Sequence, residues 1–188
     1  MDALMAAFVA ALLVQAGDRT PWLAAILADR FQRPGQVIAA AILALTITNI
    51  LGAIAGALMA PILTPNARAL LVAFALVSAG VTALGTLKHP GEMAGWRTGA
   101  FLTSLIGLAA LGVGDRTQFV TAALAAGGTP PAFAAVGATL GSLVVVIPAL
   151  LAGAAARQAL PLAAIRIGTG AVLIVAGIGA GLSALRLI

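Results

Sequence analysis

Gly17-Asp18-Arg19-Thr20 recurs without change as Gly114-Asp115-Arg116-Thr117, 97 positions further along the chain. The same offset aligns Pro34 with Pro131 without a gap. Alanine matches mean little in so Ala-rich a chain. Asp and Arg are rare here, with five acidic and ten basic residues in all, so a repeated polar sequence is informative. It predicts that the chain consists of two related halves.

The composition indicates a membrane protein. Of 188 residues, 62% are hydrophobic and 8% are charged, whereas about 25% of a soluble domain is charged. This composition excludes a cytosolic enzyme and a disordered chain. It also excludes a nucleic-acid binder, because the basic residues form no cluster. The chain has no Cys, which rules out a disulfide or thiolate site, and no Ser–His–Asp arrangement. We therefore expect no enzyme activity.

Turn and charged residues divide the apolar sequence into six stretches. A spanning helix needs about 20 apolar residues, and no two-residue alternation suggests a barrel. Because each half has three spans, the second half enters the membrane from the opposite side. The predicted fold is an all-α integral membrane protein with six transmembrane helices, arranged as two inverted three-helix repeats that together form one membrane domain. The expected spans are about 3–28, 37–59, 66–87, 98–126, 133–154 and 162–185, and the repeats are 1–94 and 95–188.

The distribution of basic residues predicts the orientation. Alternate connections lie on opposite sides, and the side with more Lys and Arg faces the cytoplasm. We therefore expect a multi-pass protein of the cell inner membrane, with both termini outside and the central loop, 88–97, in the cytoplasm. The amino terminus has no positive charge, so we interpret 3–28 as a span rather than a signal peptide. The predicted cytoplasmic residues are Arg30, Arg33, Lys88, Arg97, Arg157 and Arg166, against Arg68 and Arg186 outside.

Asp18 and Asp115 are the acidic residues that fall well inside predicted spans. A carboxylate at this depth is unfavourable, so it indicates function by default. Glycine precedes each Asp, and Pro21 follows the first motif. Both residue types loosen a helix and free backbone carbonyls. Inverted repeats with broken helices at equivalent positions are typical of secondary transporters, whose site lies near the midplane.

The donor atoms around the two motifs are all oxygens. Carboxylates, hydroxyls and amide oxygens suit hard cations such as Ca²⁺, Mg²⁺ and Mn²⁺. Burial favours the protonated form of a carboxyl group, so each Asp can take a proton when the metal leaves. We expect no cofactor, because the cation is the substrate. The predicted cation ligands are Asp18, Asp115, Thr20, Thr117, Gln15 and Gln118.

Glycine pairs spaced four apart predict close helix contacts, within the bundle or between two copies of the chain. They occur at 52–56, 137–141 and 177–181. A homodimer is therefore a candidate assembly. Asn49, in the second predicted span, is expected to form hydrogen bonds between helices.

The repeated motif resembles the Glu-x-Gly-Asp-(Lys/Arg)-(Thr/Ser) signature of the Gdt-type manganese/calcium:proton antiporters. This Golgi and bacterial family is part of the lysine-exporter-like superfamily, and the resemblance covers the whole chain. It implies that the acidic residues of both motifs form the cation site, which carries over to Asp18 and Asp115. The chain is a divergent member, because Gln15 and Gly112 stand where the family has glutamate.

The sequence thus favours a secondary transporter that exchanges Mn²⁺ or Ca²⁺ for protons across a lipid bilayer. Two alternatives stay open. One is an exporter of a small zwitterionic organic solute, bound by the Asp–Arg pairs. The other is a non-transporting membrane scaffold, in which Arg19 and Arg116 pair with the aspartates as structural links. A polar cavity that contains both Asp side chains would favour transport, and buried Asp–Arg pairs without a cavity would favour the scaffold.

Overall fold

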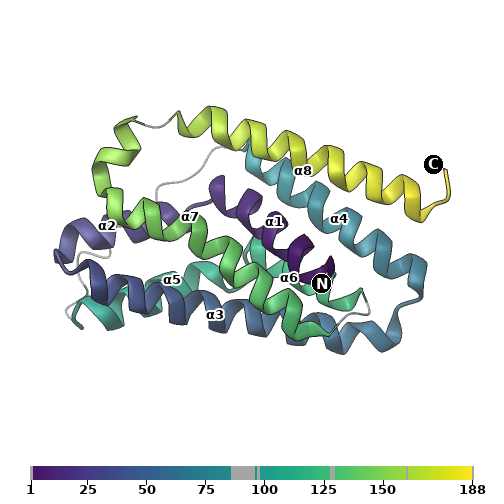
Figure 1. Cartoon of the computed structure of the whole chain (residues 1–188), viewed down its shortest axis with the longest axis horizontal. Coiled ribbons are helices and arrows are strands. Elements are labelled where there is room, and N and C mark those ends of the chain that lie inside the picture. Colours follow the sequence, from purple (N-terminus) through teal and green to yellow (C-terminus); the bar gives the residue numbers. More distant parts are fainter. Residues whose placement is uncertain (1, 86–95, 97, 128–129, 160, 188) are drawn as a thin grey trace.

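The computed structural model describes residues 2–85, 96, 98–127, 130–159 and 161–187 (Figure 1). Within these ranges the chain is helical and has no strand, which confirms the all-α prediction. The elements are α1 (Asp2–Ala16), α2 (Thr20–Phe31), α3 (Pro34–Met59), the 3₁₀ turn η1 (Ala60–Ile62), α4 (Pro65–Leu84), α5 (Ala100–Gly112), α6 (Arg116–Ala126), α7 (Pro131–Ala159) and α8 (Leu162–Ala184).

Four segments of the described chain are long and apolar enough to cross a membrane on their own: α3 with η1, α4, α7 as far as Gly153, and α8. Helices α1 and α2 satisfy the same criteria only as a pair, bent by 64°. Helix α5 is apolar but has 13 residues, and α6 follows it only after a break at 113–115. The chain is therefore a multi-pass membrane protein, whereas the sixth span and the inverted repeat stay predictions.

Both Gly-Asp motifs interrupt a helix at the same place. Helix α1 ends directly before the first motif and α2 begins at Thr20, while α5 ends at Gly112 and α6 begins at Arg116. This confirms the predicted breaks. The two motif glycines serve different purposes. Gly114 has a φ of +76°, which favours glycine, whereas a Cβ at Gly17 would lie 3.3 Å from Cγ of Arg166 in α8.

The helices pack in pairs whose members are distant in sequence. Helices α1 and α2 lie along α7, α5 and α6 lie along α3, and α4 lies against α8 (Figure 1). The glycine pairs are at these contacts. A Cβ at Gly56 of α3 would overlap the carbonyl oxygen of Ala122 in α6, and one at Gly141 of α7 would overlap that of Phe8 in α1. The predicted close-packing faces are thus confirmed within one chain.

Apolar side chains fill the spaces between the helices and also cover their outer faces. Leu27, Leu108 and Leu150 are buried together where α2, α5 and α7 meet α3. On the outside, Ile54 of α3 and Val175 of α8 are half exposed or more. An apolar outer surface of this kind is what a lipid environment requires.

Candidate cation site

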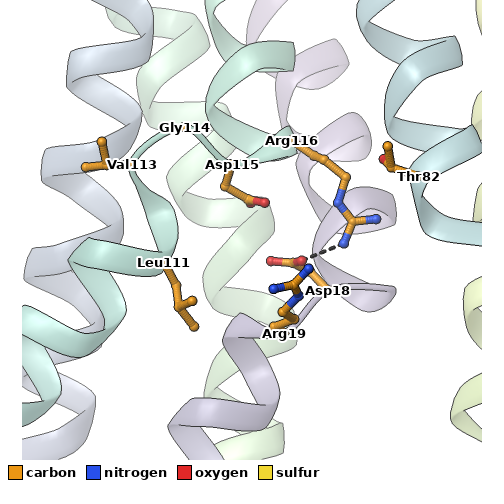
Figure 2. A pocket seen from close by; sticks show the side chains of 8 residues that line it. All are labelled: Asp18, Arg19, Thr82, Leu111, Val113, Gly114, Asp115 and Arg116. Atoms are coloured by element: carbon orange, nitrogen blue, oxygen red, sulfur yellow. Dashed lines mark hydrogen bonds and ion pairs between the residues drawn. The ribbon is translucent and has the colours of Figure 1, made fainter. Parts of the chain in front are cut away.

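The two helix breaks meet at a partly open pocket of about 340 Å³. Both motif aspartates line it, and Figure 2 shows their carboxylates near each other, that of Asp115 above that of Asp18. Helix α4 contributes Thr82, which Figure 2 shows on the far side of Arg116 from Asp115. The pocket thus collects the two acidic residues that the sequence singled out, although they are 97 positions apart. Its lining residues are Asp18, Arg19, Thr82, Leu111, Val113, Gly114, Asp115 and Arg116.

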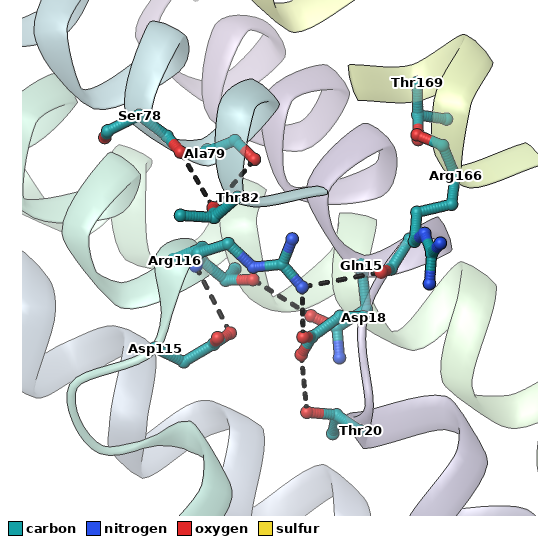
Figure 3. Close-up of polar contacts among 12 residues, drawn as sticks. Gln15, Asp18, Thr20, Ser78, Ala79, Thr82, Asp115, Arg116, Arg166 and Thr169 are labelled. Carbon is teal, nitrogen blue, oxygen red and sulfur yellow. Dashed lines mark hydrogen bonds and ion pairs between the residues drawn. The ribbon is translucent and has the colours of Figure 1, made fainter. Parts of the chain in front are cut away.

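Asp18 is held by donors from both motifs. Its Oδ1 accepts a hydrogen bond from Nη2 of Arg116 at 2.5 Å, which forms an ion pair, and its Oδ2 accepts one from Oγ1 of Thr20 at 3.0 Å (Figure 3). The Asp18 side chain is 6% exposed and that of Arg116 is 16% exposed. Nη2 of Arg116 also donates to the carbonyl oxygen of Gly17 at 3.4 Å. Arg116 therefore connects the two helix breaks.

Asp115 has a different environment. Its Oδ2 accepts a hydrogen bond from the backbone N–H of Thr117 at 3.3 Å, so Asp115 caps the amino terminus of α6. No ion pair joins Asp115 to Arg19 among the described residues, and Arg19 is exposed. The expected pairing of each Arg with an Asp is thus met by Arg116 and not by Arg19. The two motifs are equal in sequence but not in contacts.

Gln15 and Thr117 form a second link between the motifs. Oγ1 of Thr117 donates to Oε1 of Gln15 at 3.0 Å, and Gln15 is 1% exposed. Nε2 of Gln15 has no hydrogen-bond partner in the described part of the chain. The Gln15 oxygen is thus used by the second motif, and neither Gln15 nor Thr117 lines the pocket that contains Asp18.

A buried row of hydrogen-bonded polar side chains continues from this link into the bundle, and most of it was not predicted from the sequence. Oγ1 of Thr121 donates to the carbonyl oxygen of Thr117 at 2.7 Å and lies 3.4 Å from Oδ1 of Asn49. Nδ2 of Asn49 donates to Oγ1 of Thr139 in α7 at 3.3 Å. This confirms Asn49 as an interhelical residue. Thr121 and Thr139 are visible in the sequence only as single hydroxyls in apolar helices.

Gln118 holds the second helix break in place. Its Oε1 accepts from the backbone N–H of Gly114 at 2.7 Å, and its Nε2 donates to the carbonyl oxygen of Thr48 at 3.0 Å. Gln118 lines a separate, more apolar groove of about 380 Å³ between α3 and α6, which also reaches Asp115. Its amide oxygen is thus used by the loop and does not face the pocket that contains Asp18.

The position of the second missing glutamate is filled by a neighbour. A Cβ at Gly112 would lie 2.9 Å from Cγ2 and 3.2 Å from Oγ1 of Thr48 in α3. Oγ1 of Thr48 is itself fixed by the carbonyl oxygen of Ala44 at 3.0 Å. A larger side chain at Gly112 would need Thr48 to move.

The described residues contain no group of three or more His, Cys, Asp or Glu side chains that could hold a metal ion. A cation in the pocket would have two charged ligands, Asp18 and Asp115, and neutral oxygens for the rest. The four charged side chains that line the pocket cancel, because Arg19 and Arg116 balance the two aspartates. Oxygen donors of this kind suit a hard cation.

The sequence model of one protein family, described as "Divalent cation/proton antiporter GDT1", matches residues 3–90 and 100–186 of this chain. This chain belongs to the GDT1 family. The matched segments include both motifs and every candidate ligand. A relative of this GDT1 protein in Vibrio cholerae serotype O1, named "Putative manganese exporter", is 30% identical over 171 residues, which cover 88% of this chain and 84% of the relative. No solved structure matches the chain. The predicted family is confirmed. Membership of this family makes the chain a transporter of divalent cations.

Proposed function

We propose that this GDT1 protein exchanges a divalent cation, Mn²⁺ or Ca²⁺, for protons across the inner membrane. Asp18 and Asp115 would bind the cation and carry the protons. One observation carries the proposal: both aspartates line a single pocket at two matching helix breaks. The name of the Vibrio relative makes Mn²⁺ the first cation to test.

The chemistry of exchange follows from the two carboxylates. Together they match the charge of a divalent ion, and the Thr20 hydroxyl, which already contacts Asp18, adds a neutral oxygen. When no cation lies between them, two carboxylates in one site repel each other and favour uptake of a proton. Cation binding then releases protons, and protonation releases the cation. Each transport direction thus depends on the same pair of side chains.

The proposed architecture has six spans, with α1–α2 and α5–α6 each forming one broken span. Two features support the inverted repeat. The helix breaks are equivalent in sequence, and each broken span packs along the long helix of the other half, α7 or α3. Both termini would lie outside, and the packed helices would rock around the pocket to open it to each side in turn.

The experiment uses purified protein in proteoliposomes that contain a pH-sensitive dye. Gradients of Mn²⁺ or Ca²⁺ are imposed on the parent and on Asp18→Asn and Asp115→Asn. Asp29→Asn is the matched control, because Asp29 lies on α2 and does not line the pocket. We expect metal-driven proton movement in the parent and the control and none in the other two variants. Absence of coupled flux with both metals, in folded protein, would refute the proposal.

A second candidate function is export of a small zwitterionic solute. The observation that favours it is the balance of charge in the pocket, where exposed Arg19 and the carboxylate of Asp115 are not paired with each other. They would bind the carboxylate and ammonium groups of such a solute. The same proteoliposomes distinguish the two functions, because amino-acid counterflow without metal dependence would replace the cation assignment.

A further inference from the structure

We infer that Arg116 is a tethered competitor of the transported cation, which decides when Asp18 can bind metal. The guanidinium and the cation use the same carboxylate oxygen, so Arg116 must leave Asp18 before a divalent ion coordinates there. The inference rests on the proposed cation site. It assigns a specificity role to a residue that is not itself a ligand.

Asp18 is already engaged by two donors. Nη2 of Arg116 lies 2.5 Å from Oδ1, and Oγ1 of Thr20 lies 3.0 Å from Oδ2. Both carboxylate oxygens therefore already accept a hydrogen bond. A divalent ion approaches a carboxylate oxygen to about 2.0–2.6 Å. A guanidinium and a divalent ion at the same oxygen would repel each other strongly in this partly buried place.

Arg116 is held weakly enough to leave Asp18. A strong Arg–carboxylate pair uses two parallel hydrogen bonds, whereas Arg116 contacts Asp18 through one nitrogen. Its Nη1 is buried and has no hydrogen-bond partner in the described ranges. The pocket extends past Arg116 to Thr82 of α4 (Figure 2). The guanidinium thus has both an incomplete set of partners and space to move.

The two motif aspartates differ in their ion pairs. Asp115 makes no ion pair within the described residues, so it is available as the first ligand of an arriving cation. Arg116 follows it directly in the chain, at the start of α6. Figure 2 shows the Asp115 carboxylate beside the pair of Asp18 and Arg116, so a divalent ion on Asp115 comes close to the guanidinium and drives it from Asp18. A monovalent ion carries half the charge and competes less well, so Arg116 favours divalent over monovalent cations.

The test is binding of Mn²⁺, and in a parallel series of Ca²⁺, to the purified full chain, measured by calorimetry at one pH. We compare the parent with Arg116→Gln and Arg116→Lys, and we use Arg19→Gln to measure the general effect of removing a positive charge from the pocket. Removal of a competitor that occupies about nine-tenths of the sites tightens apparent binding about tenfold. We expect Arg116→Gln to bind Mn²⁺ about tenfold more tightly than the parent, a larger gain than that of Arg19→Gln. Arg116→Lys keeps the positive charge, so we expect no such gain for it.

Equal or weaker binding by Arg116→Gln would overturn the competitor role and leave the cation site itself intact. Absence of Mn²⁺ and Ca²⁺ binding in every protein would overturn the proposed function and the competitor role together. A second measurement uses the parent protein alone, so it does not depend on whether the variants fold. Phenylglyoxal labels accessible guanidinium groups, and we expect Mn²⁺ to increase labelling of Arg116 relative to Arg19. Unchanged or reduced labelling of Arg116 would contradict the inference.

Discussion

Asp18 and Arg116, 98 positions apart in the sequence, form an ion pair of 2.5 Å that joins the two helix breaks of the bundle. Each residue belongs to a copy of the same motif, so the pair ties the copies to each other. The corresponding pair of Arg19 and Asp115 is not formed among the described residues. The carboxylate of the first motif, on Asp18, is therefore neutralised by an arginine. That of the second motif, on Asp115, caps a helix.

The coupling between these two residues can be measured as stability. We expect Asp18→Asn and Arg116→Gln each to destabilise the protein, because each leaves a partly buried charge without its partner. The double variant should be less affected than the sum, with a coupling of roughly 1 to 3 kcal/mol. SDS-induced unfolding of all four proteins in mixed micelles gives this value. If the effects of the two single substitutions on the free energy of unfolding simply add, the interaction between the two side chains contributes nothing to stability.

Gly114 is predicted to be needed for transport because of its backbone. Its φ of +76° is unfavourable for alanine by about 1–2 kcal/mol, and a Cβ there meets no atom within 4 Å. Gly99 has a φ of +83° and the same open surroundings away from the pocket. Gly114→Ala and Gly99→Ala should therefore lose similar stability, while proton-coupled flux falls in Gly114→Ala alone. Similar flux in the two variants would show that the loop tolerates a shift of Asp115.

The close contact between α3 and α6 predicts a strong effect of one methyl group. A Cβ at Gly56 would overlap the backbone of Ala122, so Gly56→Ala should destabilise the protein by roughly 1–3 kcal/mol. Gly179, inside α8, has no atom within 4 Å of its Cβ position. Gly179→Ala should be neutral or stabilising by up to about 1 kcal/mol. Thermal unfolding of both variants makes the comparison, and equal melting temperatures would contradict the observed packing.

Gly112 and Thr48 should behave as a pair of complementary sizes. Gly112→Ala places a methyl group 2.9 Å from Cγ2 of Thr48, and we expect a loss of roughly 1–3 kcal/mol. Thr48→Ala in the same protein should restore much of this stability, because it removes the atoms in contact. The measurement is the melting temperature of the two single variants and the double variant. If Thr48→Ala gives no rescue, another neighbour limits the space at Gly112.

Gln15 offers a way to add a third carboxylate to the site. Its Oε1 already lies 3.0 Å from Oγ1 of Thr117, and the affinity of an oxygen site for a divalent ion rises with its number of charged ligands. We expect Gln15→Glu to tighten Mn²⁺ binding about tenfold, or by about 1.4 kcal/mol. Gln36→Glu, at the exposed start of α3, adds the same charge elsewhere. Calorimetry of both variants tests this, and an equal change in the two would indicate a long-range effect of charge.

The helix breaks and the close-packing faces were predictable from the sequence because they depend on local residue types. Glycine beside a polar residue in an apolar run predicts an interrupted helix, and helices α1–α2 and α5–α6 are interrupted there. Glycines four apart predict a close contact, and Gly56 and Gly141 make one. Such features need no knowledge of which helix lies opposite.

The contacts within the candidate site were less predictable, because they depend on the packing partner. The two motifs have the same sequence, so no sequence rule says that Arg116 pairs with Asp18 while Arg19, exposed at the pocket, does not pair with Asp115. Gln118 has an amide oxygen that suits a cation, but the loop at Gly114 uses it. Thr48 fills the space at Gly112 only because α3 lies beside α5. These assignments required the three-dimensional arrangement.

The pairing of helices α1 with α7, α3 with α6 and α4 with α8 has a consequence for assembly. Every one of these pairs joins a helix from residues 2–85 to a helix from residues 98–187, so the two segments are interlocked. Neither segment alone can cover the glycine faces of its own long helix. Expressed as two separate polypeptides, they should find each other in the membrane and reconstitute one bundle. Fragment complementation, rather than independent folding, is the behaviour that this topology dictates.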